Sequence, residues 1–136
     1  MKLATVADNI GLMDLVSALT LAFKNFTNFR GRASRGEYWW FIVATTVVSI
    51  FLSMLTRISS FYALFDSLFL LAVFIPGLSL AVRRLHDTGK SGLWMLVTFV
   101  PIVGTILLLI FMVQRGNPMA NLYGTPPLQL TSKSQN

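Results

Sequence analysis

Three long stretches of the chain carry almost no charge, and they constrain the fold more than any other feature. Tyr38 to Thr56 is nineteen uncharged residues, Phe61 to Val82 is interrupted only by Asp66, and Ser91 to Val113 is uncharged throughout. At about 1.5 Å per residue, nineteen helical residues nearly cross the ~30 Å hydrocarbon layer of a bilayer. With 54% apolar and 12% charged residues, a soluble domain of this size could not cover itself with polar surface. We therefore expect an all-α membrane protein.

Polar segments between these stretches set the expected boundaries. Charge interrupts the apolar pattern before the first stretch, so a helix there suits the membrane surface better than a span. The expected elements are a flexible leader at 1–9, an amphipathic interfacial helix at 10–29, three transmembrane helices at about 38–56, 61–85 and 91–113, and a disordered tail at 128–136. Residues 10–127 form one membrane domain in this scheme, and Pro101 and Gly104 predict a bend in the third span.

Basic residues gather in two polar islands at the ends of the apolar stretches. The islands hold Arg30, Arg32 and Arg35 in the first, and Arg83, Arg84 and Lys90 in the second. With the other Lys and Arg residues counted, eight lie on one side of the three expected spans and three on the other. The positive-inside rule then places the N-terminus and the second island in the cytoplasm and the C-terminus outside. Clustering at membrane ends argues against nucleic-acid binding, which calls for basic residues spread over one face of a soluble fold.

The two islands together predict an anion-binding face. Helix N-termini are expected near Ser34 and Ser91, and their unpaired amides and partial positive charge would suit the phosphate of a lipid headgroup. All six island residues are candidates for this role. The alternative is that these residues only set topology and form internal ion pairs with Glu37 and Asp87. Ser34 and Glu37 also have the spacing of a capping box, which predicts a helix start at about Arg35.

His86 and Asp87 are the one pair that suggests acid–base chemistry. Adjacent residues on a helix point about 100° apart, so the two side chains do not naturally face each other. A metal site needs three or four convergent ligands, whereas the chain has one histidine, no cysteine and five scattered carboxylates. We predict no catalytic residue, no metal and no cofactor, and expect His86 and Asp87 to tie their loop to Arg32, Arg35 or the first helix.

Asp66 allows two interpretations. If a helix begins near Phe61, Asp66 is an acid inside the membrane and suggests a proton or ion path. If the helix begins at Ser67, Asp66 is its N-cap, and this interpretation is favoured because the preceding aromatic residues suit an interfacial lead-in. Small hydroxyl residues also recur every four positions in the first span, at Thr45, Ser49 and Ser53. They either allow close helix packing or bond their own backbone.

Three short motifs stand in order along the chain. They are Phe29-Arg30-Gly31-Arg32-Ala33-Ser34-Arg35-Gly36-Glu37-Tyr38-Trp39, Arg83-Arg84-Leu85-His86-Asp87-Thr88-Gly89-Lys90-Ser91-Gly92 and Asn121-Leu122-Tyr123-Gly124. With them the chain, from about Phe29 to Pro127, resembles the domain-of-unknown-function 805 family of small bacterial inner-membrane proteins. The resemblance implies a multi-pass protein of the bacterial inner membrane and brings no catalytic residue with it. Combined with the charge count, it places the N-terminus in the cytoplasm and the C-terminus in the periplasm.

Three functions are consistent with these features. The leading hypothesis is a non-enzymatic membrane module that binds anionic phospholipid or a partner membrane protein through its cytoplasmic basic face. A second is a subunit of a small-solute or proton transporter, which requires a homo-oligomer because three spans enclose no path alone. A third is a membrane enzyme acting on phosphate-bearing lipid, with His86 and Asp87 as its acid–base pair.

Overall fold

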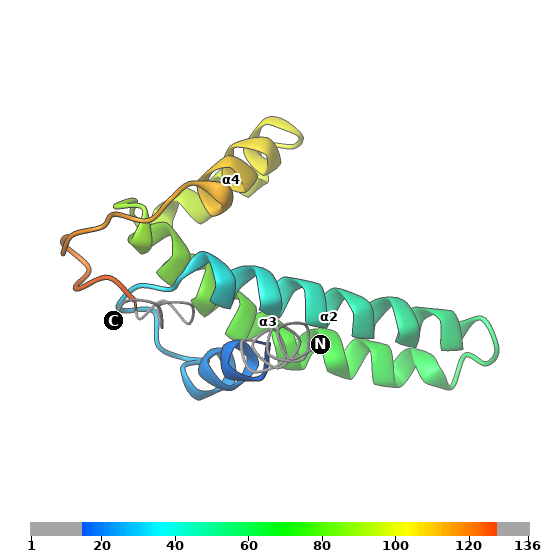
Figure 1. Cartoon of the computed structure of the whole chain (residues 1–136). Helices are drawn as coiled ribbons and strands as arrows, with labels where there is room; N and C mark the ends of the chain where they lie inside the picture. Colours follow the sequence, from blue (N-terminus) through cyan, green and yellow to red (C-terminus); the bar gives the residue numbers. More distant parts are fainter. Residues whose placement is uncertain (1–14, 128–136) are drawn as a thin grey trace, which may run out of the picture.

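The computed structural model describes residues 15–127, which form two helical hairpins and one further helix (Figure 1). The first hairpin consists of α2 (Arg35–Thr56) and α3 (Tyr62–Asp87), and the second of the 3-10 helix η1 (Gly92–Phe99) and α4 (Val103–Val113). The all-helical class is confirmed for this part of the chain. The expected leader at 1–9, the start of the interfacial helix and the tail at 128–136 lie outside the described residues.

The long hairpin pairs α2 and α3 side by side and antiparallel over their whole length. Ser34 caps α2 as expected, because its hydroxyl accepts from the amide of Glu37 at 3.1 Å. Arg83 bonds Glu37 near one end of the pair, and Ser53 bonds Asp66 near the other. With 22 and 26 residues, both helices are longer than the ~30 Å hydrocarbon layer at about 1.5 Å per residue.

The N-cap role predicted for Asp66 is wrong. Helix α3 begins at Tyr62, with Phe61 at the N-cap position, so Asp66 lies one turn inside the helix. The aromatic lead-in joins the helix because its rings stack along it: Phe61 meets Phe65 edge to face at 5.5 Å, the i,i+4 contact of a helix. Asp66 accepts a hydrogen bond from Ser53 of α2 at 3.3 Å.

The third apolar stretch does not form one spanning helix, so the transmembrane helix predicted at 91–113 is also wrong. The chain reverses direction between η1 and α4, where Ile102 has a φ of 64°. Pro101 has no amide donor and disfavours a helical Val100, so the predicted bend becomes a full reversal. The two arms pack against each other, since Trp94 of η1 meets Phe111 of α4 edge to face at 5.2 Å. Each arm is therefore about half a bilayer long.

The reversal returns the chain to the end of the long hairpin from which it left. Residues after α4 contact the loop before α2, where the Arg32 guanidinium donates to the carbonyl of Met119 at 2.8 Å. Figure 1 shows this orange segment beside the cyan loop. Up to residue 127 the chain therefore ends at the same end of the long hairpin as the loop before α2, and not at the opposite end that three consecutive spans predict.

A further helix, Leu15–Lys24, packs against the same end of the long hairpin. Its Ala18 and Ala22 are fully buried, and Ala22 joins a core cluster with Phe41 and Leu80. Past the helix end, the Ser79 hydroxyl lies 2.9 and 2.7 Å from the carbonyls of residues 25 and 28. The helical part of the predicted 10–29 segment therefore ends at Lys24, and α3 anchors the turn after it.

Gly104 provides a test of the short hairpin. A Cβ at this position would overlap the backbone carbonyl of Val97 in the facing arm, so we expect Gly104→Ala to lower the thermal unfolding temperature in detergent. The matched control is Gly36→Ala in α2, where the nearest atom to an added Cβ is 3.9 Å away. The control should gain about 0.5–1 kcal/mol from alanine's helix preference. Equal gains in both variants would contradict the tight reversal.

Candidate functional site

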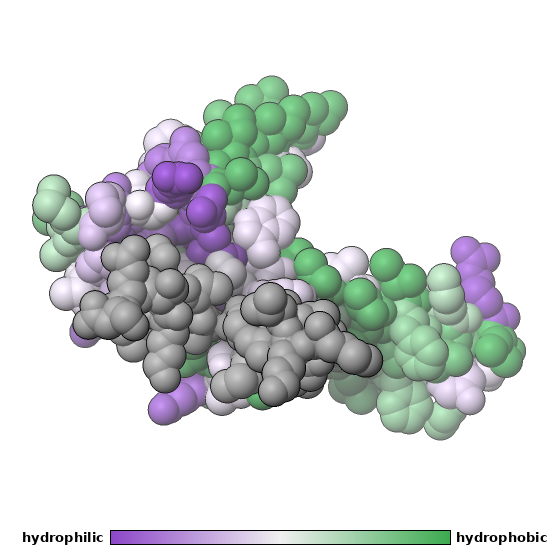
Figure 2. Space-filling model, viewed as in Figure 1, coloured by the Kyte–Doolittle hydropathy of each residue, from purple (hydrophilic) through white to green (hydrophobic). Residues whose placement is uncertain are grey.

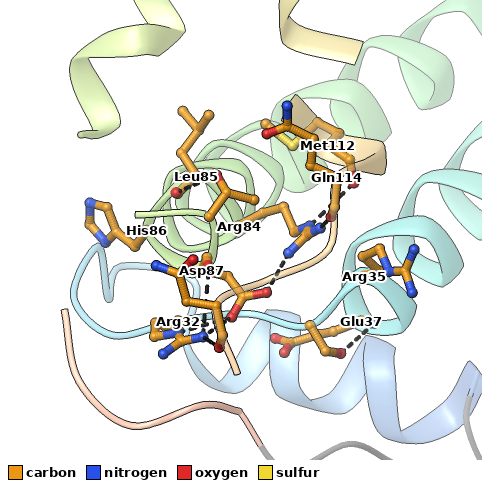
Figure 3. A network of polar contacts seen from close by, with 12 residues as sticks. Arg32, Arg35, Glu37, Arg84, Leu85, His86, Asp87, Met112 and Gln114 are labelled. Carbon is orange, nitrogen blue, oxygen red and sulfur yellow. Dashed lines mark hydrogen bonds and ion pairs between the residues drawn. The ribbon is translucent and has the colours of Figure 1, made fainter. Parts of the chain in front are cut away.

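A buried carboxylate, Asp87, lies at the centre of a polar network at one end of the helices (Figure 3). Its Oδ1 accepts from Arg32 at 2.8 and 2.9 Å, and its Oδ2 accepts from Arg84. The side chains of Arg32 and Arg84 are 1% and 0% exposed, and that of Asp87 is 6% exposed. One carboxylate therefore joins the loop before α2 to the last turn of α3.

Arg84 extends the network to the end of α4. Its guanidinium donates to the carbonyl of Met112 at 3.3 Å and to that of Gln114. Arg35 lies 3.4 Å from the carbonyl between them, that of Val113. The last carbonyls of a helix have no partner within the helix and carry partial negative charge. The two arginines therefore act as the C-terminal cap of α4.

A second buried ion pair links the two long helices. Arg83 donates to Glu37 at 3.0 Å, with the two side chains 6% and 7% exposed. The backbone carbonyl of Arg83 also accepts from the amide of Ala33 at 3.0 Å. The three buried guanidinium groups of the network thus face two carboxylates, and backbone carbonyls accept further hydrogen bonds from Arg32 and Arg84.

Residues 115–124, called here the C-terminal strap, close over this network. The amide of Asn117 donates to the Asp87 carbonyl at 2.8 Å, and Arg32 donates to three strap carbonyls, those of Asn117, Met119 and Gly124. A Cβ on Gly116 would overlap the Asp87 carboxylate, so this position needs glycine. The strap therefore supplies acceptors that the loop arginine would otherwise lack.

His86 is held by structural contacts on both faces of the loop. Its Nδ1 lies 3.1 Å from the Gly31 carbonyl, which can only accept, so this nitrogen carries the proton and donates. The imidazole stacks on the ring of Tyr123 at 3.8 Å between ring centroids. The backbone carbonyl of His86 accepts from the Asn121 side chain at 2.9 Å. His86 and Asp87 point to different partners, as adjacent helical residues do.

The structure brings the two islands together but divides their basic residues into two groups. Arg32, Arg83 and Arg84 are buried and donate to internal acceptors. The others remain at the surface: Arg30 and Arg35 are exposed, and half-buried Lys90 lies over the Phe111 ring and donates to Gln114 at 3.0 Å. Asp66 lies at the far end of the long hairpin and takes no part in this network.

A groove of about 500 Å³ opens beside the exposed Arg35. It runs from the first turns of α2 to the end of α4, and its lining residues are Arg35, Gly36, Trp39, Trp40, Val43 and Val113. Arg35 is the one charged residue of this lining, and indole rings and aliphatic side chains form most of the rest. The groove is therefore amphipathic, with one positive charge in its lining.

Several residues of the network had no signal in the sequence beyond the third motif. Asn117, Asn121 and Tyr123 meet partners that lie 30 to 85 positions away in the chain. Asn117 alone contacts Asp87, 30 positions away, and Arg32, 85 positions away. Periodicity and capping rules describe local structure only. The motif marked the strap as distinctive without indicating what it binds.

Removal of the central charge should destabilise the protein strongly. Asp87→Asn leaves two buried guanidinium groups without a carboxylate, a change that typically costs about 3–5 kcal/mol. The measurement is the free energy of unfolding in detergent micelles. Arg30→Gln is the control, since it removes an exposed charge and should change stability by less than about 0.5 kcal/mol. Similar small losses in both variants would show that Asp87 is not central to the fold.

Comparison with known proteins agrees with this arrangement of motifs. Residues 26–125 match the family described as "Protein of unknown function (DUF805)". Inner membrane protein YhaI of Escherichia coli is 43% identical over 105 residues, which cover 76% of this chain and 89% of YhaI. Inner membrane protein YhaH of the same organism is 33% identical over 109 residues, covering 76% of this chain and 90% of YhaH. No solved structure matches the chain. The chain belongs to the DUF805 family.

Proposed function

We propose that the protein is an integral membrane module of the bacterial inner membrane that binds anionic phospholipid. The groove beside Arg35 carries this proposal, because it joins one exposed guanidinium to an indole-lined apolar wall. In this account α2 and α3 cross the bilayer, and the η1–α4 hairpin enters and leaves it on one side. The buried network lies at that side as the structural base of the groove.

The surface of both hairpins supports a membrane location. Large apolar side chains point outward along them, with Phe51, Leu71 and Phe74 61%, 69% and 62% exposed. In Figure 2 the short hairpin and the visible length of the long one are mainly green, and purple gathers where the hairpins meet. Apolar surface of this extent is unfavourable in water and favourable in lipid. The relatives named as inner membrane proteins support the same location.

The distribution of charge supports one orientation. Seven Lys and Arg residues gather at the end that holds the network: Arg30, Arg32, Arg35, Arg83, Arg84, Lys90 and Arg115. The loop between α2 and α3 holds Arg57. By the positive-inside rule, the network end faces the cytoplasm. The C-terminal strap then lies in the cytoplasm as well.

The helix Leu15–Lys24 fits a position at the cytoplasmic surface of the membrane. Its small residues face the long hairpin, whereas Val16 and Phe23 are 55% and 47% exposed. Apolar side chains on the outer face of such a helix can enter the region between headgroups and acyl chains. We propose this interfacial role for the helix on the evidence of its exposed apolar face.

The lipid site follows from what the network leaves free. Internal partners occupy Arg32 and Arg84. Arg83 pairs with Glu37 through Nη1, and its other two guanidinium nitrogens are buried away from a ligand at the surface. Arg35 makes one long bond of 3.4 Å to a carbonyl and keeps its other donors exposed. Trp39 and Trp40 follow it by one turn, at the depth where indole rings favour the membrane interface. A phosphate at Arg35 would place an acyl chain along Val43.

Reporter fusions test the proposed topology. A reporter after Asn136 and one inserted at Gly89 should both behave as cytoplasmic, because the short hairpin returns the chain to the side it left. A reporter inserted at Ser59, in the loop between α2 and α3, should behave as periplasmic. A periplasmic reporter after Asn136 would restore a third span and contradict the hairpin.

Lipid retention tests the proposed function. Native mass spectrometry of the protein from nanodiscs of mixed phosphatidylglycerol and phosphatidylethanolamine should show bound phosphatidylglycerol. Arg35→Gln should weaken its retention about fivefold, since one basic residue near an anionic surface contributes about 1 kcal/mol. Arg57→Gln removes the same charge at the opposite end of the long hairpin and should leave retention unchanged. Equal losses in the two variants would indicate a non-specific charge effect.

A further inference from the structure

A second groove lies on the long hairpin, away from the network. It has a volume of about 530 Å³ and is lined from both sides of the hairpin, by Thr45, Ser49, Ser53 and Arg57 on the α2 side and by Leu70 and Val73 of α3. The outward surface of this hairpin is otherwise strongly apolar. A hydroxyl-rich groove that ends in a charged residue is therefore a departure from the lipid-facing pattern around it.

Arg57, which lines this groove, and Asp66, which lies beside it, lack a full set of partners among the described residues. The Oδ1 atom of Asp66 is buried and accepts no hydrogen bond, while Oδ2 accepts from Ser53, which lines the groove. Arg57 is exposed and forms no ion pair within residues 15–127. A partly buried acid without a cation is costly inside a membrane, as is a cation at the lipid face, so the pattern indicates that something covers the groove in the membrane.

The charges also indicate what the covering surface must carry. Arg57 and Asp66 are the only charged residues between Glu37 and Arg83, so this region offers one cation and one anion. Both lie toward the same end of the hairpin, in the last turn region of α2 and the first turns of α3. A covering surface needs an anion opposite Arg57 and a cation opposite Asp66. A second copy of this chain has both.

We infer that two copies of the protein associate through this groove. A two-fold axis along the membrane normal keeps equal depths opposed. Asp66 bonds Ser53, one turn before Arg57, so the long Arg57 side chain of each copy can reach the Asp66 carboxylate of the other. Such an interface is reciprocal, as closed dimers require. The small hydroxyl residues Thr45, Ser49 and Ser53 let the helices of the two copies approach closely. The inference rests on the transmembrane placement of α2 and α3 and is independent of lipid binding at Arg35.

Disulfide cross-linking in membranes tests the interface. The chain contains no cysteine, so a Ser49→Cys variant has one thiol, placed in the groove, and two copies should cross-link on mild oxidation. Phe51→Cys is the matched control, because two residues along a helix turn the side chain by about 200° to the opposite face. We expect at least about a tenfold difference in cross-linking rate, the equivalent of about 1.4 kcal/mol in favour of the proposed orientation. Equal rates for the two positions would overturn the proposal.

Charge reversal distinguishes pairing between copies from pairing within one copy. In the Ser49→Cys background, Arg57→Asp alone and Asp66→Arg alone should each remove the tenfold advantage in cross-linking rate over Phe51→Cys. Each change places like charges opposite one another. Membranes that contain both variants should recover this advantage, since mixed dimers then have two attractive pairs. Loss without recovery would overturn the reciprocal pairing, as would cross-linking that neither reversal changes.

Two further controls separate this proposal from its alternatives. Arg35→Gln should leave cross-linking intact, so failure of the lipid site does not imitate failure of the dimer. If the groove instead binds a different membrane protein, Ser49→Cys cross-links in nanodiscs that hold purified protein alone should be absent. That result would overturn a homodimer.

Discussion

A carboxylate buried at the end of a helix has to find its cations inside the protein, and most of this structure follows from how Asp87 does so. Arg32 reaches it from the loop before α2 and Arg84 from one turn earlier in α3. The same two arginines then extend to the C-terminal strap and to the end of α4. Buried ion pairs of this kind are weak evidence for net stability, but loss of one partner is strongly unfavourable. The positions of the loop, both hairpins and the strap therefore depend on one another.

The path of the third apolar stretch illustrates this dependence. A single helix from Gly92 to Val113 would place its last carbonyls across the bilayer from Arg84. The reversal after η1 instead brings the carbonyls of Met112 and Gln114 to the guanidinium. Pro101 permits the reversal locally, and the bonds to Arg84 favour it over a straight span. The buried network and the short hairpin thus support each other.

Local rules account for what the sequence predicted well and for what it did not. Capping chemistry located the start of α2, because Ser34 and Glu37 act within one turn. The same kind of rule failed at Asp66, where i,i+4 packing of Phe61 and Phe65 extended the helix past a residue suited to capping it. Pro101 signalled a bend, but its size depends on distant partners. The strap was visible as a motif, whereas its contacts with Arg32 and His86 join residues too far apart for periodicity to report.

The six island arginine and lysine residues also show why charge counts alone do not identify a binding site. Three of them are buried inside the protein, and the spacing of the basic residues in the sequence did not predict which ones. What remains for a ligand is the exposed Arg35 in the lining of the groove. The most direct measurement of the central claim is a double-mutant cycle over Arg32→Gln and Asp87→Asn, using unfolding free energies in detergent micelles. Because the two side chains share one buried ion pair, the account predicts a coupling energy of about 1–3 kcal/mol. Additive losses would mean that the pair does not hold the structure together.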